Sequence, residues 1–258
     1  MDVSYLDDYQ RRRKKNNKKN VKIPTPVIYL LLLAVGLYFF IHSPFFALKK
    51  ITVVGNSSLE TEKILTLSQL KPGQNLMKIN GDAVVERVSV HPLIKEVNIK
   101  RKLPNTLEII IEERKPVCLL VSPDGFIQVS AEGHFLTLVN DIGEYSLPVI
   151  SGIGLEQIPG PGQLIKNQAL TMALSIIDES EPELLHNLVE INIANEKHIL
   201  AYTETGVEIR IGSFENIKEK MTNLREILGD FQKRGVDSES IEYIDLRFNG
   251  PPVIKSKK

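Results

Sequence analysis

The pattern of hydrophobic and polar positions divides the chain into an apolar segment and a longer mixed part. Ile23 to Ile41 is a run of 19 residues without a charged side chain. As a helix with a rise of ~1.5 Å per residue it spans about 28 Å, close to the ~30 Å hydrocarbon core of a bilayer. Later segments alternate with the period of strands or repeat with the period of amphipathic helices. This pattern predicts one membrane-spanning helix followed by an α+β part.

Two interpretations of the apolar segment compete, an uncleaved anchor and a cleaved signal peptide. A signal peptide has a shorter apolar core and a cleavage site flanked by small residues. The residues that follow, HSPFFALKK, contain no A-x-A site. We therefore expect a transmembrane helix over residues 23–42, preceded by a basic tail over residues 1–22.

The zero net charge of the whole chain conceals an asymmetry. Residues 1–48 carry a net charge of +5, so the remainder carries −5. Because basic residues are retained on the cytoplasmic side, this bias predicts a cytoplasmic N-terminus and an extracytoplasmic remainder. The run RRRKKNNKKN also suits nucleic acid or anionic lipid, but it lacks interleaved aromatic residues. We expect a topogenic flank and no nucleic-acid partner.

The pattern of apolar and polar residues over positions 46–115 predicts a first unit with the order β-α-α-β-β. A strand in LKKITVVGN precedes two short helices, the first with Ser57 or Ser58 as its N-cap and the second ended by Pro92. IKEVNIKRKLPN and TLEIIIEERKP then read as a hairpin. Basic residues on its first strand face acidic residues on its second, which predicts cross-strand charge pairs.

The pattern over positions 116–253 predicts a second unit that contains both helices and strands. Turn signals at Asp124-Gly125 and Glu132-Gly133 separate short strands. A helix is predicted over Leu164–Asp178, and a clearer one in SFENIKEKMTNLREILGDFQKRG, with Ser213 as its N-cap. LVEINIA, KHILAYT and GVEIRIG read as strands, and the polar end of the chain, residues 254–258, as a frayed tail.

The stretch IEYIDLRFNGPPV reads as a last strand followed by a proline stop. Ile244, Leu246 and Phe248 fall on one face, which we expect to lie in the core. Tyr243, Asp245 and Arg247 fall on the other. A last strand often lies at a sheet edge, and the prolines at 251 and 252 are expected to prevent further pairing there.

Residues with catalytic or metal-binding spacing are largely missing. The five histidines form no H-E-x-x-H or similar ligand set, and one cysteine excludes an internal disulfide. Cys118 lies in the apolar run VCLLV, where a buried role is expected. A Ser–Lys hydrolase is not excluded by pattern alone. We expect a protein that is not an enzyme, with no cofactor and no metal.

The combination of basic flank, single span and β-α-α-β-β unit resembles the bacterial cell-division family FtsQ/DivIB. The stretches that carry the resemblance are ALKKITVVGNSSLETEKIL, HPLIKEVNIKRKLPNTLEIIIEERKPV, GVEIRIGSFENIKEKMTNL and IEYIDLRFNGPPV. The resemblance implies a POTRA domain over residues 46–115 and a β domain over residues 116–253. One departure is Leu103, where many relatives have tryptophan.

The resemblance also implies a function: a non-enzymatic scaffold of the division machinery, in the cell membrane at the septum. It would bind FtsB/DivIC-like and FtsL-like single-span proteins and act indirectly on the septal wall synthases. The implied partner site is the β-domain edge at Ile241–Phe248, with Tyr243, Asp245, Arg247 and Phe248 as candidates for binding by β-augmentation. Arg101 and Lys102 of the POTRA hairpin form a weaker candidate. A POTRA-type factor for secretion or envelope assembly is the alternative.

Overall fold

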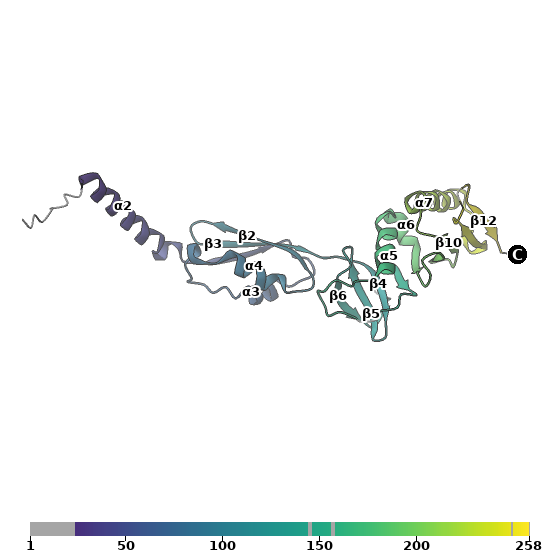
Figure 1. Cartoon of the computed structure of the whole chain (residues 1–258), viewed down its shortest axis with the longest axis horizontal. Helices are drawn as coiled ribbons and strands as arrows, with labels where there is room; N and C mark the ends of the chain where they lie inside the picture. The colour runs from purple at the N-terminus through teal and green to yellow at the C-terminus, as the bar shows by residue number, and fades with distance from the viewer. Residues whose placement is uncertain (1–23, 144–145, 156–157, 249, 258) are drawn as a thin grey trace, which may run out of the picture.

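The structure is a computed structural model that describes residues 24–143, 146–155, 158–248 and 250–257. Figure 1 shows an elongated chain, with a helix at one end, a small unit in the middle and a larger unit at the other end. The basic tail predicted over residues 1–22 lies outside the described residues.

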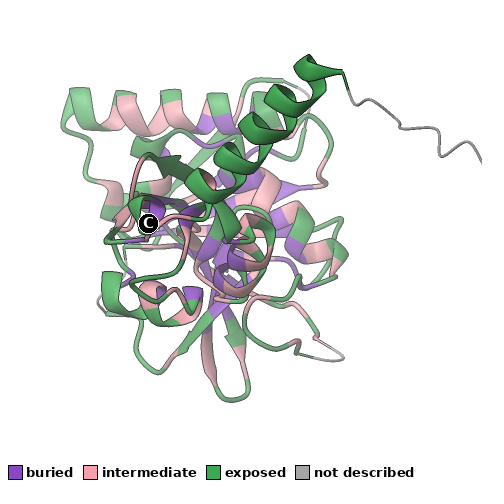
Figure 2. Cartoon of the chain, turned by 90° about the vertical axis from the view of Figure 1, so that its left-hand side faces the viewer, coloured by how far each residue is buried: buried purple, intermediate pink, exposed green. Residues whose placement is uncertain are grey.

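The helix is α2, Thr25–Ile41. It is long and apolar enough to cross a membrane, and none of its residues is buried against the rest of the protein (Figure 2). A helix whose apolar side chains are exposed on all sides needs an apolar solvent, which a bilayer supplies. By length and composition, α2 is therefore a candidate membrane span.

The first unit has the predicted order β-α-α-β-β. Its elements are β1 (Lys50–Val54), α3 (Thr61–Ser68), the 3-10 turn η2 (Leu76–Lys78), α4 (Gly81–Ser89), β2 (Ile94–Lys102) and β3 (Thr106–Glu113). The sheet order is β1-β3-β2, with β3 parallel to β1 and antiparallel to β2. Apolar residues from both helices and all three strands form one core, including Ile64, Val84, Leu107 and Ile109.

Charge pairs cross the β2–β3 hairpin as predicted. Lys95 Nζ lies 2.9 Å from Glu112 Oε1, and Lys102 pairs with Glu108. Lys95 also reaches Glu132 of the second unit at 3.3 Å, so one lysine connects the two units.

The predicted N-cap of α3 is wrong, and Glu113 explains why. The helix begins at Thr61 after Glu60, whereas Ser57 and Ser58 lie in the preceding turn. Their amides and that of Leu59 donate to the Glu113 carboxylate at 2.9, 2.8 and 3.0 Å, and Ser57 Oγ adds a fourth bond at 2.9 Å. Burial opposes ionisation of this carboxylate, but the four donors outweigh it and lower the pKa of Glu113.

The second unit is built on one nine-stranded sheet, in the order β12-β11-β10-β9-β8-β7-β4-β5-β6. The strands are β4 (Pro116–Ser122), β5 (Gly125–Ser130), β6 (Phe135–Val139), β7 (Val149–Ser151), β8 (Leu188–Asn192), β9 (Ile199–Thr203), β10 (Glu208–Gly212), β11 (Ile241–Asp245) and β12 (Val253–Ser256). The helices are α5 (Gln168–Asp178), α6 (Pro182–Asn187) and α7 (Ile217–Arg234), with a short 3-10 turn η3 (Ser238–Ser240) before β11.

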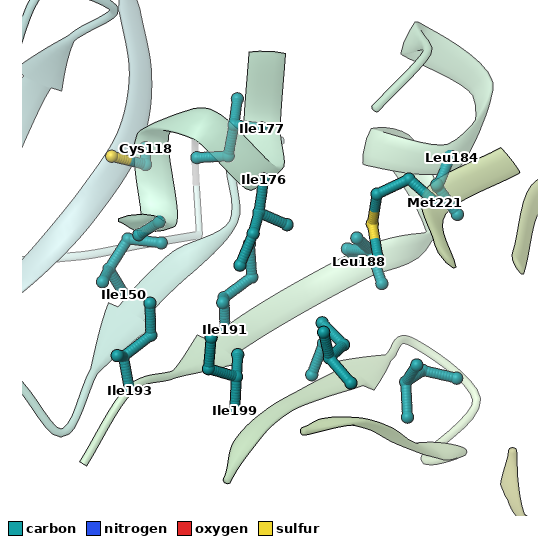
Figure 3. Packing of buried hydrophobic residues seen from close by; sticks show 14 of the residues in the cluster. Cys118, Ile150, Ile176, Ile177, Leu184, Leu188, Ile191, Ile193, Ile199 and Met221 are labelled. Carbon is teal, nitrogen blue, oxygen red and sulfur yellow. The ribbon is translucent and has the colours of Figure 1, made fainter. Parts of the chain in front are cut away.

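The helices of this unit pack on the sheet through apolar side chains. Figure 3 shows Ile176 and Ile177 of α5 and Met221 of α7 over strand residues such as Ile191 and Ile199. Cys118 is fully buried in this core, as expected, and burial raises the pKa of its thiol to about 12. The thiol therefore stays protonated at neutral pH.

Two helix starts differ from their predictions, and α6 was not predicted. α5 begins at Gln168 rather than Leu164, because Leu164 forms a β-bridge with His134 and the Asn167 side chain caps the helix by accepting from Leu170 N. α7 begins at Ile217 after Asn216, which has a positive φ of 55°, and not after Ser213.

The C-terminal end of the sheet contradicts three predictions. β11 is not an edge strand, because β10 and β12 lie on its two sides. Residues 254–256 belong to β12 and are not a frayed tail. The prolines at 251 and 252 do not end the pairing, because they lie in the connection, where no ladder N–H is needed, and Val253 resumes the strand.

Phe248 was also predicted to lie in the core, and that prediction is wrong. β11 ends at Asp245, so the period-two alternation does not extend to residue 248. Ile244 and Leu246 are buried, whereas Phe248 is 70% exposed.

We predict that Glu113→Ala destabilises the turn at residues 57–59 by about 1–3 kcal/mol, because three backbone donors lose their acceptor. The folded-state pKa of Glu113 is lowered, so this contribution is fully present at neutral pH and is lost as the pH falls through that pKa. Hydrogen exchange of the full-length protein in micelles measures the change at the amides of residues 57–59.

The matched control for this prediction is Glu112→Ala, whose carboxylate is exposed and pairs only with Lys95 in the described residues. A variant of Glu113 that exchanges no faster than this control at neutral pH would contradict the assigned role.

Candidate functional site

The candidate residues Tyr243 and Asp245 of β11 lie on the face of the sheet opposite the helices. Tyr243 on β11 is in register with Glu208 on β10 and Lys255 on β12, and Asp245 with Arg210 and Val253. Their neighbours Ile209 and Ile244 point to the buried side. Because side chains alternate along a strand, the polar set shares the outer face.

Asp245 and Arg247 form a close ion pair at the end of β11. The Asp245 carboxylate accepts from the Arg247 backbone N at 3.0 Å and from its guanidinium Nε and Nη2 at 2.9 and 2.6 Å. Arg247 thereby lowers the pKa of Asp245, and Arg210 adds a smaller effect of the same sign. Asp245 is 7% exposed, so this carboxylate is part of the fold rather than a free contact residue.

Tyr243 is covered by a cation from the adjacent strand. The guanidinium carbon of Arg210 lies 3.7 Å from the centre of the Tyr243 ring, and Lys255 Nζ approaches the ring at 5.4 Å. Arg210 also pairs with Glu208 at 2.6 Å. The tyrosine is half-buried by these contacts, which fix its ring in a cation–π arrangement.

The exposed residues of this region lie beyond β11 and on β12. Phe248 is 70% exposed, Val253 54% and Ile254 43%. Lys255 Nζ pairs with Glu242 at 2.9 Å across the two strands. Among the described residues no strand lies on the far side of β12, so β12 is the free edge at this end of the sheet, and β6 is the outermost strand at the other end.

The backbone of β12 has hydrogen-bonding groups directed away from β11. Lys257 N donates to Ser240 O at 2.7 Å, which directs the N–H of residue 257 toward β11. Since these groups alternate along a strand, those of residues 255 and 253 face the same way. The N–H and C=O groups of Ile254 and Ser256 therefore face outward and are available to another strand.

Arg101 and Lys102 have contacts within the first unit. The Arg101 guanidinium donates to the carbonyl oxygens of Leu76 at 3.2 Å and Ile79 at 2.7 Å, and Lys102 pairs with Glu108. Arg101 thus fastens the end of β2 to the loop before α4.

The charged side chains of the outer face are arranged in ion pairs. Each cation is paired with a carboxylate on the same or an adjacent strand, and the part of the chain that the structure describes holds no cluster of three or more metal-ligating side chains. The face offers paired charges and aromatic surface, and the edge offers unpaired main-chain groups.

Comparison with known proteins assigns both units. Residues 46–114 match the family described as POTRA domain, FtsQ-type, and residues 120–247 match the C-terminal domain of cell division protein FtsQ/DivIB. The chain belongs to the FtsQ/DivIB family. We therefore call the first unit the POTRA domain and the second the β domain.

Relatives with this family name cover most of the chain. The cell division protein DivIB of Clostridium botulinum is 25% identical over 100% of this chain and 99% of its own length. DivIB of Clostridium tetani is 29% identical over 87% and 85%, and FtsQ of Syntrophotalea carbinolica 26% over 83% and 75%.

Solved structures also match the chain. One of them is the major extracytoplasmic domain of the trans isomer of DivIB from Geobacillus stearothermophilus, 16% identical with a TM-score of 0.34, covering 49% of this chain and 99% of its own.

The family match ends at Arg247, before Phe248 and β12. The sequence interpretation missed β12, and with it the contacts of Lys255 and the exposure of Ile254. One signal was present: the β-branched pair Val253-Ile254 follows a Gly-Pro-Pro turn, as the second strand of a hairpin does. Arg210 was missed because cross-strand register is not visible in sequence.

We predict that Arg247→Ala raises the pKa of Asp245 and destabilises the β11–β12 end of the β domain, because a buried carboxylate loses its partner. The pKa of Asp245 is lower in the folded state than in the unfolded state. The ion pair therefore stabilises the fold fully at pH values above the unfolded-state pKa, and this stabilisation is lost as the pH falls through the folded-state pKa. Hydrogen exchange of β12 at neutral and acidic pH measures both effects.

Lys255→Ala is the control, because its ion pair with Glu242 is exposed and solvent screening makes such pairs contribute little to stability. Equal protection of β12 in the two variants would show that Arg247 does not support this end of the sheet.

Proposed function

We propose that this protein is a non-enzymatic scaffold of the divisome, which connects early and late division proteins and helps to control septal peptidoglycan synthesis. Membership of the FtsQ/DivIB family supports a role in cell division. The single observation that carries the binding mechanism is the free edge of β12, with its outward main-chain groups.

The partners we propose are FtsB/DivIC-like and FtsL-like single-span proteins. An extended segment of such a partner adds to the β12 edge, and main-chain hydrogen bonds supply most of the affinity. Val253 and Ile254 are exposed beside this edge, and alternate side chains of the added strand select the partner. Phe248 and the paired Tyr243 and Arg247 border the same surface.

This mechanism differs from direct pairing with β11. The edge of β11 is already occupied by β12, whose four residues pair with Ile241 to Asp245. A partner therefore extends the sheet outward from β12. Asp245 and Arg247 act indirectly, by holding the end of β11 in place, while Tyr243 contributes through the face of the sheet.

We predict that Ile254→Pro weakens capture of the partner by about tenfold, because it removes an outward N–H that bonds the added strand. The substitution leaves the inward groups of β12 in place. Binding of purified full-length protein to a DivIC-like partner in micelles, measured by titration, tests this expectation.

Ile254→Ala is the matched control, since it removes the same side chain but keeps the N–H. Hydrogen exchange at Lys255 verifies that β12 remains paired in both variants. If the proline and alanine variants bind equally well, partner addition at β12 is refuted while the family membership stands.

The proposed location is the division septum, with the N-terminus in the cytoplasm and both domains outside. The apolar helix α2 supports membrane anchoring, and the basic residues before it support this orientation.

We predict that a fluorescent protein fused to the N-terminus fluoresces in the cytoplasm and concentrates at mid-cell in dividing cells. Time-lapse microscopy of living cells measures this, with α2 alone fused to the same reporter as control. A uniform membrane signal throughout the cycle would contradict a divisome role.

A further inference from the structure

The anchor helix is joined to the POTRA domain by direct contacts rather than by a free linker. Asn75 Nδ2 donates to the carbonyl oxygen of Ile41, the last residue of α2, at 2.8 Å. Phe46 is buried, and its ring packs edge-on against Phe40 with the centroids 5.3 Å apart. The helix therefore has a defined direction relative to the domain.

Backbone pairing extends this junction to two loops of the POTRA domain. Leu48 N donates to Gln74 O at 2.7 Å, and Gly73 N donates to Leu48 O at 2.8 Å. Lys49 N donates to Asn105 O at 2.8 Å, which brings in the turn between β2 and β3. The loop before α4 and this turn consequently lie at the end of the domain that adjoins the anchor (Figure 1).

This end of the domain is basic. Lys49, Lys50, Lys71 and Lys78 are exposed, and none of them forms an ion pair within the described residues. Lys102 adds a fifth ammonium group, which pairs with Glu108. The other carboxylate close by in sequence is that of Asp82, in the first turn of α4. The positive charges therefore exceed the negative ones here.

Large apolar side chains stand among these lysines. Phe45 is 56% exposed, Leu103 62% and Met77 43%. Phe45 and Met77 lie in short 3-10 turns and Leu103 in the turn after β2, and Met77 and Leu103 each adjoin a lysine in the sequence. Exposed apolar side chains among basic residues suit an interface between headgroups and acyl chains. Arg101 supports it from within by binding the carbonyl oxygens of Leu76 and Ile79.

We define the basic rim as Lys49, Lys50, Lys71 and Lys78, together with Phe45, Met77 and Leu103. We propose that the basic rim rests on the bilayer that holds α2 and binds the headgroups of anionic phospholipids. Anionic lipid is the ligand we infer because of where the rim lies. α2 lies in the bilayer, and its last residue, Ile41, accepts a hydrogen bond from Asn75 in the loop that carries the rim. The inference requires α2 to be a membrane anchor but does not require the proposed partners.

Folding brings the lysines of the basic rim together, and their clustering cannot be seen in the sequence. Lys49 and Lys50 follow the apolar segment directly, whereas Lys71 and Lys78 come more than twenty residues later. Each lysine held near an anionic surface contributes about fivefold to binding, and the contribution decreases within a Debye length. Four such groups on one end therefore favour a docked orientation of the domain strongly.

The test uses the full-length protein in nanodiscs of phosphatidylcholine alone or of a three-to-one mixture with phosphatidylglycerol. Leu103→Cys provides a site for a fluorophore, because the native Cys118 is fully buried. Quenching by a lipid with a spin-labelled headgroup reports contact between the rim and the surface. We expect stronger quenching with phosphatidylglycerol, which declines as salt is added.

Replacing Lys49, Lys71 and Lys78 by glutamine is expected to lower the ratio of docked to undocked protein by about tenfold or more in the anionic nanodiscs. The matched control replaces Lys166, Lys197 and Lys257, which are exposed on the β domain, and removes the same charge. Hydrogen exchange of β3 verifies that both triple variants are folded.

Quenching that is equal in the two lipid mixtures, or equal in the two triple variants, would overturn the proposal. The salt titration of the labelled Leu103→Cys protein, with every lysine retained, decides the question even if a triple variant does not fold. Partner capture at β12 is measured separately, so failure of the lipid contact and failure of the proposed function are distinguishable.

Discussion

The central strand of the POTRA sheet, β3, is the element on which the arrangement of the whole chain depends. It pairs with β1 on one side and β2 on the other. Its first residue, Thr106, follows the turn whose Asn105 carbonyl accepts from Lys49 N. Its last residue, Glu113, binds the turn after β1. Only two residues separate Glu113 from the start of β4. The position of the β domain relative to the anchor helix therefore depends on β3 and on the two residues between β3 and β4. The Lys95–Glu132 ion pair is a second link between the two domains.

At the end of the sheet far from the POTRA domain, the outermost strand is β12. An exposed edge invites uncontrolled pairing, and natural proteins shorten or charge such strands. β12 has four residues, includes a lysine paired with Glu242, and follows two prolines. These features restrict the edge to a short addition, which suits one partner segment better than open-ended assembly. The pair between the buried Asp245 carboxylate and the exposed Arg247 guanidinium supports this edge from the end of β11, because Arg247 lies in the connection that returns as β12.

Sequence periodicity predicts the order of elements in the POTRA domain well, because its apolar alternation in β3 and its helix stripe around Ile64 reflect the same core. It fails where a decisive contact is distant in sequence. Ser57 looks like a helix cap until Glu113, 56 residues away, is seen to bind it. IEYIDLRF looks like an eight-residue edge strand until pairing with Val253 and Ile254 shows that it ends at Asp245 and lies inside the sheet. Arg101 looks like a solvated contact until the loop carbonyls beside it are known. Register and loop packing are tertiary properties that local patterns do not encode.

The two proposed surfaces lie at opposite ends of an elongated molecule, as Figure 1 shows for the anchor and the C-terminus. A flexible linker after α2 would let the β12 edge take up any height and direction above the membrane. The bond between Asn75 and Ile41, and the ring of Phe46 against Phe40, remove much of that freedom. Restricting orientation raises the effective concentration of the edge for a partner that is anchored in the same bilayer and presents its own segment at a fixed height. A docked basic rim would thus restrict the position of the β12 edge above the membrane. The short length of β12 would in turn restrict which partner segments can bind to that edge.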